Sequence, residues 1–164
     1  MGSGKMKGLS SPPSEIVRVR GYQTGEVNTG TGYFTLNDVV PINTDGNEFM
    51  SFVYTPKSAA NRLKVDVVIF MSNDTTNRMT AALYKDAVVN AIACGLSTGA
   101  AATGGACPIK FSSPIFVAGT NSPITFKVRG GAVTGGTATF NGEGGLRKFG
   151  GAMASGIVVT EMIP

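Results

Sequence analysis

The side chains that most often carry catalysis are scarce in this chain. It contains no histidine, which is the commonest general base and a frequent metal ligand. A pair of carboxylates can cleave a glycosidic bond without histidine. The acidic residues that could supply such a pair are Asp38, Asp45, Glu48, Asp66, Asp74, Asp86 and Glu143. Most of them fall in expected turns or on the polar side of expected strands, where solvated ions are the simpler interpretation. The sequence therefore predicts no catalytic residue and no enzymatic activity.

Cys94 and Cys107 are the only cysteines, and they flank a loop rich in Gly, Ala and Thr. Two cysteines without two further ligands do not make a structural zinc site. A disulfide would close the loop, whereas a reducing cytoplasm, where we expect the protein to be made, keeps both side chains as thiols. We expect reduced thiols and no metal, with the disulfide as the alternative.

Two further segments resemble ligand-binding motifs only in composition. Residues 43–47 (NTDGN) are rich in oxygen but lack the spacing of an EF-hand calcium loop. A tight β-turn, in which Asp45 and Gly46 adopt positive φ angles, is the simpler interpretation. Residues 141–151 (NGEGGLRKFGG) match neither a P-loop nor a dinucleotide-binding fingerprint. No cofactor is therefore expected.

The elements that must position these residues are indicated by a period of two. In residues 63–71 (LKVDVVIFM) the side chains of Leu63, Val65, Val67 and Ile69 alternate with the others, as in a strand with one buried face. Strands are expected at 31–36, 48–54, 63–71, 78–85, 87–93, 107–117, 122–129, 136–140 and 150–162. Because no strongly amphipathic helix separates these short segments, the pattern predicts an all-β, antiparallel sandwich or barrel.

Residues 1–30 differ from the rest and are expected to form an extended arm in front of a domain at 31–164. The arm has few large apolar side chains, and the Pro12–Pro13 pair resists both helix and sheet. Its cations are Lys5, Lys7, Arg18 and Arg20. Such an arm could bind an acidic protein surface or nucleic acid, or remain a solvated tail. Residues 15–20 (EIVRVR) alternate, so a short strand is expected there if a partner surface supplies the other edge.

Composition favours self-association. Hydrophobic residues make up 42% of the chain and charged residues only 15%, whereas a soluble monomer normally carries about 25% charge. A weakly charged surface loses little hydration when copies meet, so oligomerisation is expected. No stretch approaches the roughly 20 apolar residues that cross a bilayer, so a membrane is not an expected partner.

The last third of the chain carries the most specific sequence segments. Residues 125–131 (TFKVRGG), 137–142 (TATFNG) and 144–162 (GGLRKFGGAMASGIVVTEM) resemble the C-terminal signature of small jelly-roll modules in virion proteins of tailed phages. Residues 48–70 and 79–93 look like earlier strands of the same module. The resemblance covers about residues 31–162 and implies a trimeric jelly roll similar to that of tumour necrosis factor. Such modules serve as fibre tips, head fibres and capsid decorations.

The resemblance implies a structural protein on the virion surface. We expect a homotrimeric knob, fibre or decoration that docks on a capsid or tail protein through its arm. The expected anchoring residues are Glu15, Ile16, Val17, Arg18, Val19 and Arg20. The residues expected in a subunit interface or in the core are Phe149, Met153, Ile157 and Val159. Loops 95–106 and 141–148 are expected to face outward.

The alternative is a lectin-like tail-fibre tip that recognises host surface glycans. Sugar binding usually needs an aromatic platform. The chain has no tryptophan and four tyrosines, Tyr22, Tyr33, Tyr54 and Tyr84, so this platform is weakly supported. Nucleic acid is not among the expected partners.

Overall fold

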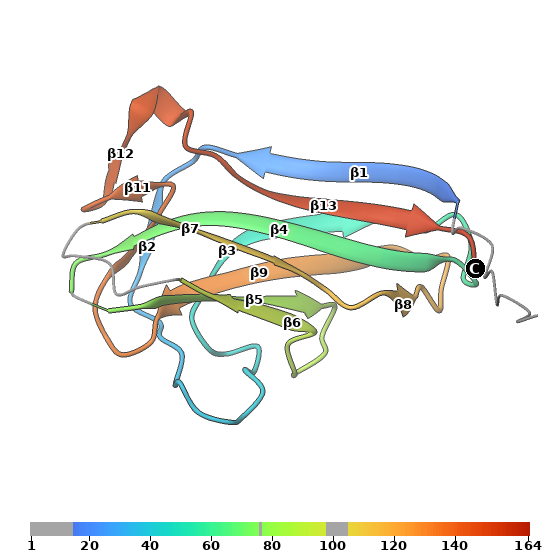
Figure 1. The fold of residues 1–164 in the computed structure, drawn as a ribbon, viewed down its shortest axis with the longest axis horizontal. Helices are drawn as coiled ribbons and strands as arrows, with labels where there is room; N and C mark the ends of the chain where they lie inside the picture. Colours follow the sequence, from blue (N-terminus) through green and yellow to red (C-terminus); the bar gives the residue numbers. More distant parts are fainter. Residues whose placement is uncertain (1–14, 76, 98–104) are drawn as a thin grey trace, which may run out of the picture.

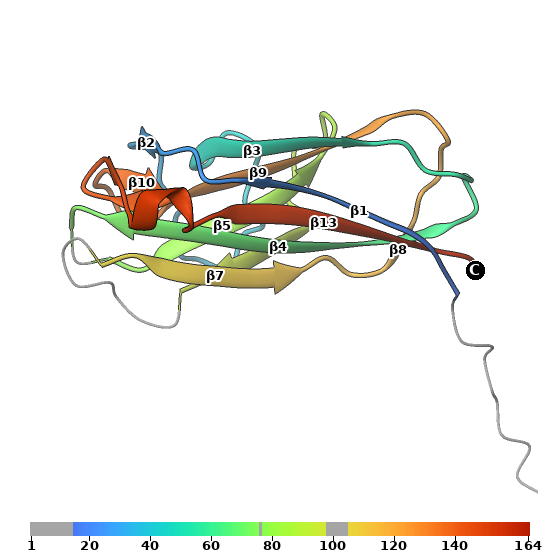
Figure 2. The same cartoon turned by 90° about the horizontal axis from the view of Figure 1, so that it is seen from above.

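The computed structural model describes residues 15–75, 77–97 and 105–164, which form two antiparallel β-sheets packed face to face (Figures 1 and 2). This confirms the all-β, antiparallel sandwich predicted from the period of two. In these three ranges there is no helix long and apolar enough to span a membrane.

Each sheet has four main strands. In sheet 1 they run in the order β1 (Ile16–Thr24), β13 (Ser155–Met162), β4 (Arg62–Asn73) and β7 (Cys107–Ser112). Three short strands extend this sheet. β8 (Phe116–Val117) and β10 (Ala138–Phe140) pair with β4, and β2 (Asn28–Gly30) pairs with β10. In sheet 2 the order is β3 (Asn47–Tyr54), β9 (Ile124–Ala132), β5 (Met79–Lys85) and β6 (Ala93–Leu96). A hairpin of β11 (Gly142–Glu143) and β12 (Leu146–Arg147) leads into a 3-10 turn, η1 (Phe149–Gly151).

The pairing of the main strands is nested, which defines the fold. Along the described chain, the first main strand pairs with the eighth (β1 with β13) and the second with the seventh (β3 with β9). The third pairs with the sixth (β4 with β7) and the fourth with the fifth (β5 with β6). A chain that pairs in this way is one long hairpin rolled into two sheets, which is the jelly roll. The expected jelly-roll sandwich is therefore confirmed.

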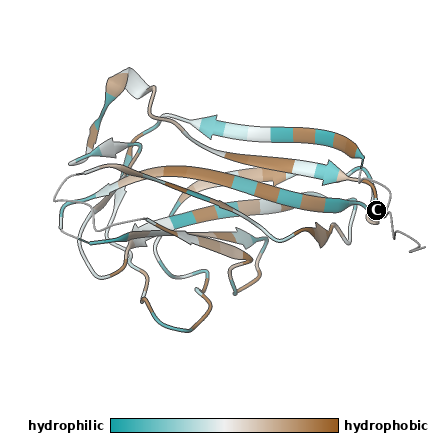
Figure 3. Cartoon of the chain, in the orientation of Figure 1, coloured by the Kyte–Doolittle hydropathy of each residue, from teal (hydrophilic) through white to brown (hydrophobic). Residues whose placement is uncertain are grey.

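The core lies between the sheets and follows the predicted alternation. On β4 the side chains of Leu63, Val65, Val67 and Ile69 are at most 1% exposed, and Figure 3 shows the matching stripes of polar and apolar residues along this strand. Phe126 on β9 faces them from sheet 2 and is fully buried. Each such side chain contributes about 1.5–3 kcal/mol by leaving water, so these two strands dominate the interior.

A second, smaller cluster corrects the strand expected at 31–36. Only an isolated bridge between Tyr33 and Ala132 forms there. Phe34 instead packs with Ala82 and Tyr84, on the side of β5 that faces away from the main core. The apolar residues of this segment therefore cover a sheet from outside, which local alternation does not distinguish from a strand.

The strand expected at 87–93 is also wrong. Asp86 has a φ of 52° and begins a turn, and Val88 and Val89 stay exposed. Two expected strands are shorter than predicted as well. The segment 107–117 is interrupted after Ser112, and the final strand begins at Ser155 rather than at residue 150.

The described part of the expected arm belongs to the sandwich. β1 pairs with β13 over its length, and β2 pairs with β10, so the sandwich begins well before residue 31. The alternation at residues 15–20 did indicate a strand, but its partner edge is β13 of the same chain. Residues 1–14 of the arm, with Lys5 and Lys7, lie outside the described residues.

The turn at 43–47 was predicted correctly in kind but not in detail. Gly46 has a positive φ of 62°, whereas Asp45 does not. Asp45 instead accepts a hydrogen bond from the Ile42 amide through Oδ2 at 2.9 Å. Arg129 donates to the carbonyl oxygens of Asp45 and Gly46, each at 2.7 Å, so a strand of sheet 2 holds the turn in place.

Candidate interaction surface

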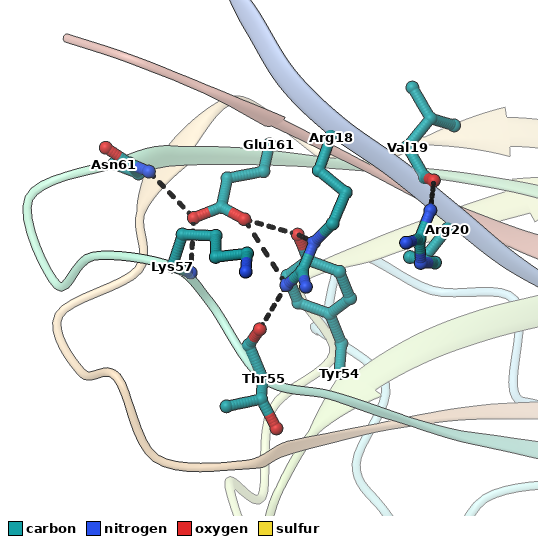
Figure 4. A network of polar contacts seen from close by, with 8 residues as sticks. All are labelled: Arg18, Val19, Arg20, Tyr54, Thr55, Lys57, Asn61 and Glu161. Atoms are coloured by element: carbon teal, nitrogen blue, oxygen red, sulfur yellow. Dashed lines mark hydrogen bonds and ion pairs between the residues drawn. The ribbon is translucent and has the colours of Figure 1, made fainter.

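The end of β13 carries a buried carboxylate. Glu161 is 0% exposed and lies on the inner face of sheet 1, where it follows Ile157 and Val159 in alternation. Its Oε2 accepts a hydrogen bond from the Tyr54 hydroxyl at 2.5 Å. Its Oε1 accepts one from Asn61 Nδ2 at 2.8 Å and one from the Lys57 amide at 2.7 Å (Figure 4). A carboxylate at this depth is tolerated because both of its oxygens are bonded.

Arg18 of β1 completes this cluster from the edge of the sheet. Its guanidinium lies 4.7 Å from the centre of the Tyr54 ring and 3.5 Å from Glu161 Oε2. Nε donates to the Tyr54 hydroxyl at 3.1 Å, and NH2 donates to the carbonyl of Thr55. We call Arg18, Tyr54, Asn61 and Glu161 the strand latch, because they tie β1 to β13 and to the end of β3.

Protonation of Glu161 is governed by two opposing effects. Burial raises the pKa of the carboxyl, but the hydrogen bonds from Tyr54, Asn61 and the Lys57 amide outweigh burial and hold the pKa below its ordinary value. Burial, followed by the hydrogen bond to Glu161, raises the pKa of the Tyr54 hydroxyl. At neutral pH the strand latch therefore contains a carboxylate, a phenol and a guanidinium.

The strand latch alters the expected anchoring set of Glu15 to Arg20. Arg18 points inward and is engaged, whereas Arg20 stays exposed and donates a hydrogen bond to the Val19 carbonyl at 3.0 Å. Ile16, Val17 and Val19 are exposed large apolar residues. No residue of β1 is buried, and β1 forms one edge of sheet 1, so its outward edge keeps unpaired backbone groups.

A shallow groove lies on the outer face of sheet 1. Gly21 of β1 is opposite Val158 of β13, and Gly156 of β13 is opposite Val68 of β4. The two glycines leave a hollow of about 520 Å³. An added Cβ at Gly21 would lie 2.9 Å from the Ile157 carbonyl oxygen, so the close approach there requires glycine. We call this hollow the outer groove. Its lining residues are Gly21, Tyr22, Gln23, Asp66, Val68, Ala154, Gly156 and Val158.

The lining of the outer groove is mainly apolar. Val158 is 39% exposed, although it lies in the middle of a central strand. Asp66 is the one charged residue of the lining, and it pairs with Lys64 Nζ at 2.8 Å and accepts a hydrogen bond from Ser112. Burial raises the pKa of Asp66, but Lys64 and Ser112 outweigh burial and lower the pKa. Asp66 therefore stays ionised at the rim.

Residues 142–151 form a projecting tip beyond one end of β1 (Figure 1). Phe149 is 80% exposed and Leu146 is also exposed. Phe149 has a φ of 49°, and Gly150 and Gly151 also have positive φ. A non-glycine residue in the left-handed region costs about 1–2 kcal/mol. The tip thus holds an aromatic side chain in water at a cost in backbone energy.

A buried polar side chain holds the base of the tip through hydrogen bonds. Asn141 is fully buried, and its Nδ2 donates to the carbonyls of Thr24 at 2.7 Å and Glu26 at 3.1 Å. Its Oδ1 accepts from Ser155 Oγ at 2.6 Å, and Ser155 Oγ accepts from the Phe70 amide at 2.9 Å. The tip is therefore fixed to the end of β1, to the start of β13 and to β4.

The four residues expected in an interface or in the core divide between two environments. Ile157 and Val159 are fully buried in the core, Met153 is half-buried, and Phe149 is exposed. The outward residues of β13 beside the outer groove are Gly156 and Val158, which the sequence analysis did not single out for a surface role. Side chains alternate between the two faces of a strand, so the outward position of Gly156 and Val158 follows once Ile157 is known to be buried.

The other chemical candidates stay apart in the described chain. Glu48 lies 3.6 Å from Lys127 and 3.9 Å from Arg129. Asp74 and Asp86 accept hydrogen bonds from backbone amides. Glu143 lies 3.8 Å from Lys148, and Asp38 is exposed. The described residues contain no group of three or more His, Cys, Asp or Glu side chains that could hold a metal.

The cysteines and tyrosines do not gather into a site either. Cys94 is exposed and Cys107 is half-buried, and both are free. Burial raises the pKa of the Cys107 thiol. Tyr54 and Tyr84 are buried, whereas Tyr22 and Tyr33 are exposed. Of the loop expected at 95–106, residues 98–104 lie outside the described residues.

Comparisons with known proteins give only distant similarity. No protein-family model matches the chain, and no curated protein sequence matches it significantly. A subviral particle of VP2 from infectious bursal disease virus matches with a TM-score of 0.43 at 13% identity, over 100% of this chain and 42% of that chain. The Gt strain of the same virus matches with a TM-score of 0.39 at 14% identity, over 91% of this chain and 39% of that chain. The chain thus spans less than half the length of either structure, and its jelly-roll assignment rests on the strand order described above.

Proposed function

We propose that this protein is a self-assembling structural component of a tailed-phage particle, a homotrimeric knob, fibre or decoration on the virion surface. The observation that carries the proposal is the mainly apolar outer groove on the exposed outer face of sheet 1. A sheet face that stays in water normally carries polar residues. Here Val19 and Val158 are exposed on that face, and the outer groove lies between β1 and β4.

A second copy of the chain fits this face better than a charged partner does. Lys64 and Asp66 already pair with each other at 2.8 Å, so burying them together costs less than burying either charge alone. The low share of charged residues, 15%, acts in the same direction over the whole surface. Jelly rolls also occur in lectins, but only two of the four tyrosines are exposed here, which gives glycan binding less support.

Attachment to the particle is proposed to run through residues 1–14 and the free edge of β1. Lys5 and Lys7 give the first segment a positive charge. The edge of β1 offers unpaired backbone groups beside exposed Ile16 and Val17, and an extended segment of a capsid or tail protein can pair with such an edge. Arg18 does not take part, because the strand latch engages it.

The test is to add purified protein back to phage particles that lack it. We expect the full chain to bind, and a chain without residues 1–14 to remain a folded oligomer that fails to bind. Val158→Lys on the outer face should weaken assembly and, with it, attachment. Val53→Lys is the matched control, because Val53 is exposed on sheet 2. Particle binding by the chain without residues 1–14 would show that the sandwich, and not this segment, makes the contact.

A further inference from the structure

We infer that the tip of one copy seats in the outer groove of a neighbouring copy, with the Phe149 ring as the inserted side chain. This inference rests on the self-assembly proposed above and specifies how two copies meet. It assigns to one chain both halves of the contact, a projecting apolar residue and an apolar hollow. Neither half has an occupant or cover among the described residues.

The tip has the properties of an inserted side chain. Phe149 is the most exposed of the large apolar residues that the structure describes, at 80%. Its positive φ and the two glycines that follow it turn the ring outward. Asn141 and Ser155 hold the base of the tip to three strands, so little order remains to be imposed when a partner binds. Pre-organisation of this kind reduces the entropic cost of association.

The outer groove suits an aromatic ring in size and chemistry. Its volume of about 520 Å³ exceeds those of the two apolar hollows beside segment 34–41, about 280 and 240 Å³. The side chains of Val68, Ala154 and Val158 offer apolar contacts, and Gly21 and Gly156 expose flat backbone on which a ring can lie.

Charged groups lie at the edge of the contact. Arg147 and Lys148 immediately precede Phe149, and Asp66 is the one charged residue that lines the outer groove. The ion pairs that these cations make within the chain are long, with 3.8 Å between Arg147 and Glu26 and 3.8 Å between Lys148 and Glu143. Insertion of Phe149 brings these cations towards Asp66 of the neighbour. Because Lys64 already pairs with Asp66 at 2.8 Å, this exposed contact contributes to orientation and adds little affinity.

The contact pairs two different patches, so it can repeat head-to-tail from copy to copy, as the proposed trimer requires. Such contacts form a closed ring when the rotation between copies closes. Ala154 lines the outer groove only five positions after Phe149 in the sequence, so the two patches are neighbours on each copy. In the proposed ring every copy gives one tip and receives another.

Thiol cross-linking tests the contact directly. In a chain in which Cys94→Ser and Cys107→Ala remove the native thiols, Phe149→Cys and Val158→Cys are made in separate copies and mixed. A short bis-maleimide replaces the span of the missing ring. We expect covalent dimers only in the mixture, and no cross-link within either variant alone. Cross-linking by Phe149→Cys alone would indicate a two-fold contact between tips and would overturn the inference.

Two controls keep the result specific. Phe149→Cys mixed with Val39→Cys tests the competing hollow beside segment 34–41, since Val39 lines it. A cross-link in that mixture, and not with Val158→Cys, would overturn the inference. In the native-thiol chain, Phe149→Ala should weaken association about 30-fold or more, as expected for an aromatic residue at the centre of an interface.

The outcomes separate this inference from the proposed function. If the wild-type chain assembles and the Phe149→Ala chain assembles equally well, the tip contact is wrong and self-assembly stands. If the wild-type chain does not assemble at any concentration, self-assembly itself is wrong. If the cross-link forms and Phe149→Ala weakens assembly, both stand.

Discussion

At the scale of single residues, Glu161 shows how a surface-like amino acid becomes part of a core. Glutamate in a strand usually faces water, but here its parity with Ile157 and Val159 turns it inward. Its carboxylate survives there because Tyr54, Asn61 and the Lys57 amide donate to it. A hydrogen bond to a charged group contributes about 1.5–3 kcal/mol, so the strand latch stabilises the end of β13 and holds β1 against it.

The lowered pKa of Glu161 makes this contribution dependent on pH. A carboxyl whose pKa is lower in the folded state stabilises the fold above its ordinary pKa, and the contribution disappears as the pH falls through the folded value. We expect Glu161→Gln to lower the free energy of unfolding by about 1–3 kcal/mol at neutral pH. In strong acid the difference from wild type should shrink. Urea unfolding over a pH series measures both effects.

Glu143→Gln is the matched control for this series. Its carboxylate is partly exposed and lies 3.8 Å from Lys148, so its loss should change the unfolding free energy by no more than about 1 kcal/mol. A Glu161→Gln chain as stable as wild type at neutral pH would contradict the role given to the strand latch.

At the scale of elements, β1 is held by its partner strand and by the strand latch rather than by burial. None of its residues is buried, so its backbone pairing with β13 and the inward side chain of Arg18 keep it in place. Arg18 also supplies the positive charge next to the buried Glu161 carboxylate. Removal of one partner from a buried ion pair is costly, because the remaining charge has no compensation.

Two N-terminal deletions distinguish the contribution of β1 to stability from that of residues 1–14. Deletion of residues 1–14 leaves β1 and Arg18 intact, so the melting temperature should stay within about 2 °C of wild type. Deletion of residues 1–20 removes Arg18 and half of β1. We expect it to destabilise the fold by about 3 kcal/mol or more, which is roughly 6–12 °C for a domain of this size. Thermal unfolding followed by circular dichroism measures both. Equal melting temperatures would show that β1 adds no stability to the sandwich.

The sequence predicted the strands in which one face is fully buried. Residues 48–54 and 63–71 correspond closely to β3 and β4, because alternation is clear where one side faces the core and the other is more exposed. Residues 78–85 correspond closely to β5, which is buried on both sides. The segments 31–36 and 87–93 were wrong for the opposite reason. Phe34 packs on the outside of a sheet, and Val88 and Val89 stay exposed.

Long-range pairing could not be inferred from local pattern. The alternation at residues 15–20 indicated a strand, but its partner β13 lies at the other end of the chain. The bond between Tyr54 and Glu161 joins residues 107 positions apart. The sequence did contain one signal that Glu161 is buried, since Ile157, Val159 and Glu161 are two residues apart and so lie on the same face of a strand. The same alternation also places Gly156 and Val158 on the outer face.

At the scale of the whole molecule, the nested pairing of eight strands encloses the core and leaves two exposed apolar features. The first is the outer face of sheet 1 with its groove, and the second is the tip with Phe149. Aromatic residues are enriched at protein interfaces, and an apolar groove is a surface that a partner can cover. Both features are explained if copies of the chain cover each other, and a particle surface that displays the protein in many copies would use the same contacts.

The most direct test of this account is the native mass of the full chain at a series of concentrations, compared with Val158→Lys. We predict a complex of three times the 16.8 kDa subunit mass, and a shift of the Val158→Lys chain towards the mass of one subunit with unchanged secondary structure. A wild-type chain that keeps the mass of one subunit at every concentration would contradict it.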